Sequence, residues 1–158
     1  MSEFSHLDKT GKANMVNVVE KSITQRLAKA RAVVYLPEEV LAQLNAGDIQ
    51  TKKGSVFQIA IVAGIMAAKK TGDLIPLCHP LGMDNCNVDI SINEANEVVI
   101  DCTAVITAKT GIEMEALVGA SVAALTIYDM CKALSHDIVI KEVKLMEKKG
   151  GKRDFKRS

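Results

Sequence analysis

Two neighbouring segments with a strict alternation of apolar residues place the strongest limit on the fold of this chain. Every second residue is apolar from Cys86 to Ile92, and the same period returns from Val98 to Ile106 after a short polar turn. Side chains on a strand point alternately to opposite faces, so each segment has one face suited to a core. The pair therefore predicts an antiparallel hairpin.

Two long apolar segments flank this hairpin and predict helices. The first covers about Ser55–Lys70 and is apolar round most of its circumference, so one sheet face cannot bury all of it. The second runs from Thr110, where Glu113 completes a capping-box pattern, to about Leu134, and its glycines and alanines predict close backbone packing. This surplus of apolar helix surface, in a chain with 3% aromatic residues, predicts contacts between identical subunits.

The remaining elements complete a regular order. Strands are expected over Ile23–Leu36 and about Ile138–Met146. A short helix is expected over Pro37–Ala46 with Gly47 as its left-handed cap, followed by a polar loop over Asp48–Lys52. The order strand, helices, strand, strand, helix, strand predicts an α+β protein of the ferredoxin-like βαββαβ type, with helices on one face of an antiparallel sheet.

Length and charge limit the organisation of the chain and its classes of partner. Residues 1–158 fit one domain, with mobile ends expected at about 1–12 and 151–158. The 20 basic and 19 acidic residues give a net charge of +1, which argues against a broad nucleic-acid surface. Four cysteines without C-x-x-C spacing, and no signal-peptide pattern, predict a cytoplasmic protein. The longest apolar stretch, Val56–Ala68, is well short of the roughly 20 residues of a membrane helix, so no membrane partner is expected.

An unusually apolar loop, Asp73–Leu81, contains two prolines and presents Cys78 and His79. Because loops are usually polar, this one is either part of a site or a buried connector whose histidine bonds to backbone. A metal site would need further ligands at recognisable spacing, so no metal is expected. Cys78 has no charged neighbour in sequence and starts no helix, which favours packing over thiol reactivity.

The second long helix carries a candidate acid–base pair. Asp129 and Lys132 are three residues apart, so they share one helix face. Their apolar neighbours suggest partial burial, which would lower the pKa of Lys132 toward the working pH, but an ordinary surface ion pair is the alternative. Glu115, in the first turn, is either a solvated acid favoured by the helix dipole or an acceptor for an amidine-like ring edge.

Lysines gather at the ends of elements and in loops, where most would be solvated. A converging subset could hold a polyphosphate, because one such contact near a protein surface gives a gross attraction of about 4 kcal/mol. The chain has no P-loop signature, so a phosphate site here would be of another kind.

Three sequence blocks carry a resemblance to a known family. They are DLIPLCHP at Asp73–Pro80, KTGIEMEAL at Lys109–Leu117 and LTIYDMCKA at Leu125–Ala133. Together they resemble the cyclic pyranopterin monophosphate synthase family of molybdenum cofactor biosynthesis, and the likeness covers nearly the whole chain. Two departures are Asn17, where the family usually has aspartate, and a C-terminal run at Gly150–Phe155 that is one residue shorter.

The resemblance implies a lyase that needs no cofactor. Its substrate would be 3′,8-cyclo-7,8-dihydro-GTP, supplied by an upstream radical S-adenosylmethionine enzyme. The products would be cyclic pyranopterin monophosphate and pyrophosphate. The family also implies a hexamer, built as a trimer of dimers from ferredoxin-like subunits, with each active site at a subunit interface.

Roles for single residues follow from the same resemblance. Lys53 and Lys132 would be the acid–base lysines, with Asp129 orienting Lys132. Positions that would line the substrate pocket are Leu77, Cys78, His79, Glu113, Met114 and Glu115. Candidates for triphosphate contacts are Arg26, Lys69, Lys148 and Lys152.

Two other functional classes stay open from the sequence. Ferredoxin-like oligomers often bind small ligands between subunits without reacting them, so a non-catalytic nucleotide-binding regulatory module is one alternative. Such a module would not need Asp129 and Lys132. A nucleotide phosphohydrolase is the other, but it would normally supply carboxylates for a metal, and the three blocks contain no such cluster.

Overall fold

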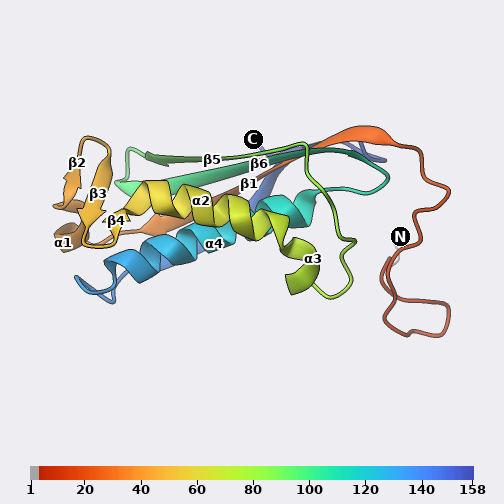
Figure 1. The fold of residues 1–158 in the computed structure, drawn as a ribbon, viewed down its shortest axis with the longest axis horizontal. Coiled ribbons are helices and arrows are strands. Elements are labelled where there is room, and N and C mark those ends of the chain that lie inside the picture. The colour runs from red at the N-terminus through yellow and green to blue at the C-terminus, as the bar shows by residue number, and fades with distance from the viewer. Residues whose placement is uncertain (1–3) are drawn as a thin grey trace.

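The computed structural model describes residues 4–158 and has two layers, a five-stranded antiparallel sheet and a pair of long helices on one of its faces (Figure 1). The strand order is β5-β6-β1-β7-β8. The α+β class expected from the sequence is confirmed. The strands of this sheet are β1 Thr24–Tyr35, β5 Asn85–Ile92, β6 Glu97–Ala108, β7 Val139–Lys149 and β8 Phe155–Lys156.

The predicted hairpin is present as β5 and β6. Its register pairs Cys86 with Ala104 and Ile92 with Val98. The alternate residues of β6 that begin at Val98 are buried, as the period of two requires. Asn93 closes the turn, because its side-chain oxygen accepts hydrogen bonds from the backbone N–H groups of Ala95 and Glu97.

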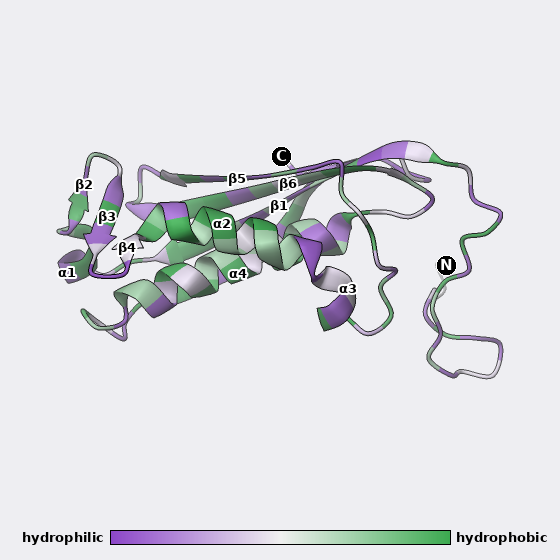
Figure 2. Ribbon diagram, viewed as in Figure 1, coloured by the Kyte–Doolittle hydropathy of each residue, from purple (hydrophilic) through white to green (hydrophobic). Residues whose placement is uncertain are grey.

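The two long helices, α2 (Val56–Lys69) and α4 (Glu113–Cys131), pack against each other and against the sheet. Hydrophobic residues dominate both helices (Figure 2). The close backbone packing predicted from the small residues of the second long helix is present. Gly64 of α2 allows the two helices to approach, since a Cβ at that position would lie 2.9 Å from the carbonyl oxygen of Gly119 on α4. The sulfur of Cys102 on β6 fills the space above Gly119.

A small three-stranded sheet replaces part of the structure expected after β1. Helix α1 covers only Glu38–Leu41, so the expected helix over Pro37–Ala46 is wrong in length. Strand β2 (Leu44–Asn45) pairs with β3 (Asp48–Thr51), which the sequence suggested as a loop. The third strand is β4, Gly54–Ser55.

The turn between β2 and β3 explains this difference. Ala46 and Gly47 both have positive φ, at 52° and 79°, as a tight hairpin turn requires. Gly47 is therefore a turn residue, and its assignment as a helix cap is wrong. Asp48 secures the segment, because its Oδ1 accepts a hydrogen bond of 2.8 Å from the backbone N–H of Phe57 at the start of α2.

The expected capping box at Thr110 is also wrong. Helix α4 begins at Glu113, Ile112 takes the N-cap position, and no side chain caps the helix. The carboxylate of Glu113 folds back over Gly111 and lies 3.5 Å from Nζ of Lys148. The side chain of Glu113, which a capping box would use, therefore forms an ion pair with Lys148 on β7. The helix ends at Cys131, before Leu134.

Helix α4 is long and apolar enough to span a membrane when judged by length and composition alone. It is largely buried between the sheet and α2, with fully buried residues that include Ala116, Ala120 and Ala124. That environment is the one expected of the core helix of a globular fold.

We expect Gly64→Ala to destabilise the protein by about 1–3 kcal/mol, because the added methyl group forces α2 and α4 apart. The matched control is Gly82→Ala, where an added Cβ would meet nothing within 4 Å. Urea unfolding at one fixed protein concentration measures the difference. Equal stability of the two variants would show that the helices are not in tight contact at Gly64.

Candidate active site

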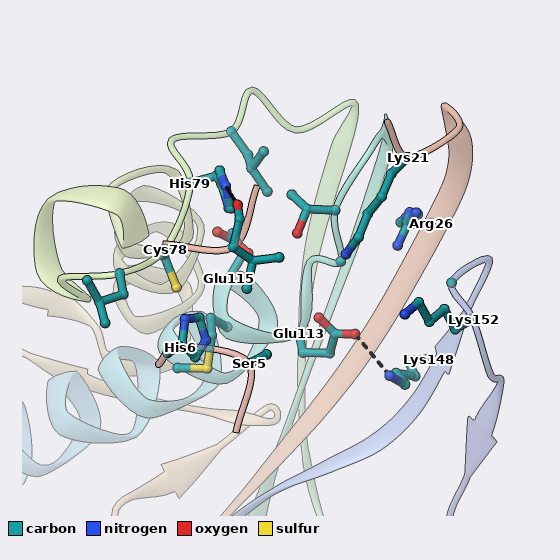
Figure 3. A pocket seen from close by; sticks show the side chains of 17 residues that line it. Ser5, His6, Lys21, Arg26, Cys78, His79, Glu113, Glu115, Lys148 and Lys152 are labelled. Atoms are coloured by element: carbon teal, nitrogen blue, oxygen red, sulfur yellow. Dashed lines mark hydrogen bonds and ion pairs between the residues drawn. The ribbon is translucent and has the colours of Figure 1, made fainter. Parts of the chain in front are cut away.

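A cavity of about 360 Å³, here called the main cavity, lies where several distant parts of the chain meet (Figure 3). Its walls come from the segment before β1, from β1, from the loop after α3 (Thr71–Leu74), from the start of α4 and from the end of β7. Most of the expected substrate-binding residues line it, namely Arg26, Leu77, Cys78, His79, Glu113, Met114, Glu115, Lys148 and Lys152.

Basic side chains gather on one side of the main cavity (Figure 3). Arg26 is oriented by Thr24, whose hydroxyl accepts a hydrogen bond of 3.1 Å from Nε of Arg26 and donates one of 2.7 Å to the carbonyl of Gly150. This chain of hydrogen bonds brings the segment that carries Lys152 against β1. Nζ of Lys148 lies 3.5 Å from the carboxylate of Glu113, and the basic side chains together make this side of the cavity suited to a polyanion.

Glu115 and Cys78 form the opposite side of the main cavity. Glu115 is only 3% exposed, so the alternative interpretation of Glu115 as a solvated acid is wrong. Burial, with a smaller contribution from the negative charge of Glu113, raises the pKa of Glu115. Burial also raises the pKa of the Cys78 thiol, as do the charges of Glu115 and Glu113. The Cys78 thiol is therefore protonated, and the carboxyl of Glu115 takes up a proton more readily than that of an exposed glutamate.

His79 is both a wall of the main cavity and a structural contact. Its Nε2 donates a hydrogen bond of 2.7 Å to the carbonyl oxygen of Val16. The backbone contact that the sequence left as one alternative is thus present, and the ring still faces the cavity. His79 holds the segment before β1 against the loop that carries Cys78.

Lys53, Asp129 and Lys132 form a second group, here called the Lys–Asp cluster. Lys132 donates a hydrogen bond of 2.8 Å to Oδ1 of Asp129, and Nζ of Lys53 lies 3.8 Å from Oδ2. All three side chains are half exposed or more, so the expected partial burial is wrong for the protomer. The hydrogen bond with Lys132 lowers the pKa of Asp129, and the same bond raises the pKa of Lys132.

The Lys–Asp cluster and the main cavity lie at opposite ends of α4. An α-helix rises about 1.5 Å per residue, so Glu113 and Asp129 are about 24 Å apart along the axis. Figure 1 shows the small sheet that carries Lys53 at one end of α4 and the N-terminal segment at the other. Within one protomer the structure does not bring the expected acid–base residues to the expected binding residues.

Lys69 is also placed away from the main cavity. It lines a smaller cavity of about 260 Å³ together with Asp84 and Cys86. No group of three or more His, Cys, Asp or Glu side chains in residues 4–158 is arranged to hold a metal ion.

Several residues of the main cavity were missed by sequence reasoning. Ser5, His6 and Lys21 line it from the segment before β1. The part of that segment around Ser5 and His6 is mostly polar, and the segment has no regular apolar period, so its sequence does not predict that it folds back onto the sheet. A single histidine in such a segment gives no signal of its own.

Comparison with known proteins shows a close relationship along the whole chain. Residues 15–151 match the model of the MoaC family. The chain is 49% identical over 154 residues to the cyclic pyranopterin monophosphate synthase of Xanthomonas campestris pv. campestris (strain B100), which covers 98% of this chain and 93% of that protein. A protein of the same name from Xanthomonas axonopodis pv. citri (strain 306) is 50% identical over 156 residues, with the same coverage of both chains. Molybdenum cofactor biosynthesis protein 1 of Dictyostelium discoideum is 47% identical over 168 residues, which cover 96% of this chain and 27% of that longer protein.

We expect Glu115→Gln to be more stable than wild type near neutral pH, because ionised Glu115 is held in a buried site that disfavours its charge. A raised pKa means that the wild-type protein gains stability as pH falls through that value, whereas glutamine does not titrate. The advantage of the variant therefore shrinks toward acidic pH. Urea unfolding at neutral and at mildly acidic pH measures it.

The matched control is Glu113→Gln in the same helical turn. This variant loses the ion pair with Lys148 and should gain no stability at neutral pH. An advantage of Glu115→Gln that is absent, or that does not change with pH, would contradict the buried-acid assignment.

Proposed function

The chain belongs to the MoaC family, and we propose that it converts 3′,8-cyclo-7,8-dihydro-GTP to cyclic pyranopterin monophosphate with release of pyrophosphate. Relatives that are about half identical over nearly the whole chain carry the name of this synthase. The observation that carries the proposal is the main cavity, which has a basic side for a triphosphate and a buried acidic side for a guanine-derived ring.

The basic side of the cavity is suited to bind the triphosphate of the substrate and to stabilise pyrophosphate as it leaves. Closure of the cyclic phosphate breaks a phosphoanhydride bond, so negative charge grows on the departing pyrophosphate. Arg26, Lys148 and Lys152 are placed to stabilise this charge, and the hydrogen bond from Arg26 to Thr24 holds the guanidinium in position. This part of the reaction needs cations rather than a redox cofactor.

The acidic side supports recognition of the ring. Because burial raises the pKa of Glu115, its carboxyl takes up a proton more readily and can form hydrogen bonds to the amidine-like edge of the substrate. Leu77 and Met114 provide apolar surface beside it. His79 assists because its hydrogen bond to the carbonyl of Val16 holds the loop that carries Leu77.

The rearrangement also needs proton transfers, which we assign to the Lys–Asp cluster. In one protomer this cluster is about 24 Å from the main cavity along α4. We infer that the protein is a homo-oligomer in which the cluster of one subunit covers the cavity of its partner. A two-fold axis would create two such sites per dimer, and three dimers would make the hexamer expected for the family.

Assembly would also change the protonation chemistry of the cluster. In the exposed protomer the hydrogen bond to Asp129 raises the pKa of Lys132. Covering the cluster by a partner removes water, and desolvation lowers the pKa of a lysine. One lysine could then act as a base while Asp129 keeps the other protonated as an acid.

The outer surface of the two long helices supports subunit contacts. Val62 and Met66 on α2 and Leu125 on α4 are each more than half exposed. Large apolar side chains on neighbouring helices are typical of surfaces that a second subunit covers. We further infer a ferredoxin-like scaffold, from the order of its long strands and helices, and a cytoplasmic location, from the unpaired cysteines.

We expect purified protein to form pterin from the cyclic dihydro-GTP substrate, and Lys53→Ala and Lys132→Ala to lower turnover by about 100-fold or more while still assembling. Fluorescence of the oxidised pterin measures turnover, and size-exclusion chromatography checks assembly. Lys144→Ala is the matched control, because that lysine forms an ion pair with Glu142 on β7 and should keep wild-type activity. Binding of nucleotide without any pterin from wild type would favour a regulatory module.

We expect two inactive variants to restore activity when their subunits are mixed. Arg26→Ala damages the main cavity and Lys132→Ala damages the Lys–Asp cluster. In a mixed dimer one site then carries both changes and the other carries neither, so random mixing should restore about one quarter of wild-type turnover. Turnover after co-refolding equal amounts of the two variants measures this recovery. Mixed oligomers that stay inactive would contradict a site shared between subunits.

A further inference from the structure

The segment that precedes β1 is the least explained part of the main cavity. Residues 5–21, here called the N-terminal strap, contribute Ser5, His6, Val16 and Lys21 to the cavity wall. His6 lies on the side of Cys78 and Glu115, whereas Lys21 lies on the side of Arg26 (Figure 3). The N-terminal strap therefore contributes residues both to the basic side of the main cavity and to the side of Glu115 and Cys78.

The first part of the strap is a preformed hairpin. Leu7 pairs with Ala13 in an antiparallel bridge, and the backbone N–H of Asn14 donates a hydrogen bond of 2.8 Å to the carbonyl of His6. Asp8 closes the turn, since its Oδ1 accepts hydrogen bonds from the backbone N–H groups of Thr10 and Lys12. The position of His6 is therefore set by local structure.

The strap is held to the rest of the protein by few contacts. Its side chains are mostly exposed, and Val19 is 73% exposed. Among residues 4–158, two hydrogen bonds anchor it, from His79 to the carbonyl of Val16 and from Nζ of Lys109 to the carbonyl of Val19 at 3.3 Å. A segment with few buried apolar contacts opens at a low free-energy cost. The strap can therefore lift to admit a ligand and settle again.

The ring of His6 is available to a ligand. The ring of His79 already donates a hydrogen bond to the carbonyl of Val16. The ring of His6 makes no hydrogen bond within residues 4–158. A neutral imidazole offers one donor and one acceptor, which suits the polar edge of a purine-derived ring or the hydroxyls of a ribose. Lys21 offers a cation at the other end, where a phosphate would lie.

We propose that the N-terminal strap closes over the bound nucleotide and that His6 contacts this nucleotide directly. The inference rests on the proposed function for the identity of the nucleotide, and it adds a substrate-binding residue and a closing segment to that site. Closure removes water from the cavity and so strengthens the interactions of Arg26 and Lys148 with the phosphates. It also presents a folded surface to the partner subunit's Lys–Asp cluster.

Steady-state kinetics of His6→Ala test the contact. We expect kcat/KM to fall by about tenfold or more, the effect of losing one hydrogen bond to a polar or charged ligand group. His6→Gln keeps a donor and an acceptor and should recover part of the loss. The matched control is Lys9→Ala in the same hairpin, which does not line the cavity and should keep kcat/KM within about twofold of wild type.

Limited trypsin digestion tests the closure without turnover. Lys9 and Lys12 lie in the exposed hairpin, and cleavage after them reports how often the strap opens. We expect saturating substrate, added to the Lys132→Ala variant that cannot consume it, to slow this cleavage several-fold. The same protection should be weaker in the double variant that also carries His6→Ala.

The outcomes separate this inference from the proposed function. A wild-type protein that forms no pterin overturns the synthase assignment, whereas the digestion still tests the strap with the bound nucleotide. Wild-type kcat/KM in His6→Ala overturns the direct contact. Cleavage at Lys9 and Lys12 that substrate leaves unchanged overturns the closure.

Discussion

The rigidity of α4 is the constraint on which the functional interpretation depends. This helix is buried between the sheet and α2, and glycine at the crossing point brings its backbone against that of α2. It carries Glu113 and Glu115 at its first turn and Asp129 at its last, about 24 Å apart. A close-packed helix cannot bend enough to join its ends. Chemistry that needs both ends must therefore use two copies of the chain, and the exposed apolar residues of α2 and α4 provide a surface for that contact.

The two ends of α4 also differ in their electrostatics, and the difference suits separate tasks. Glu115 is buried, and burial raises its pKa, so its carboxyl takes up a proton more readily than that of an exposed glutamate. The Lys–Asp cluster is solvated, and the hydrogen bond between Lys132 and Asp129 raises the pKa of the lysine and lowers that of the aspartate. A solvated lysine with a raised pKa is a poor base at neutral pH. Assembly would supply the missing desolvation, so subunit contact and proton-transfer capacity would arise in the same step.

The sequence predicted the elements whose patterns depend on burial against a single face. The alternation over Cys86–Ile106 and the apolar stretch Val56–Ala68 correspond to the β5–β6 hairpin and to α2, because long periodic segments outweigh local propensity. The capping box failed because α4 begins at Glu113 itself, whose carboxylate lies 3.5 Å from Nζ of Lys148 on a distant strand. The small sheet was missed because its strands of two to four residues are too short to show a period.

The site was predictable only in part, for a related reason. Motif blocks identified residues on both sides of the main cavity and in the Lys–Asp cluster, but no local pattern tells which of them meet in space. Nor could a local pattern reveal that the Lys–Asp cluster is exposed, since the exposure of a side chain depends on the tertiary structure around it. The N-terminal strap was missed because a segment without a regular apolar period gives no sign that it folds back, and His6 was missed with it.

The most direct test of the shared site is a structure of the Lys132→Ala oligomer bound to the unreacted cyclic dihydro-GTP substrate. We expect a nucleotide whose phosphates lie against Arg26 and Lys148 of one protomer, with Lys53 and Asp129 of a neighbouring protomer beside its ribose and ring. A nucleotide enclosed by a single protomer, with every copy of Lys53 and Asp129 remote from it, would contradict a site shared between subunits.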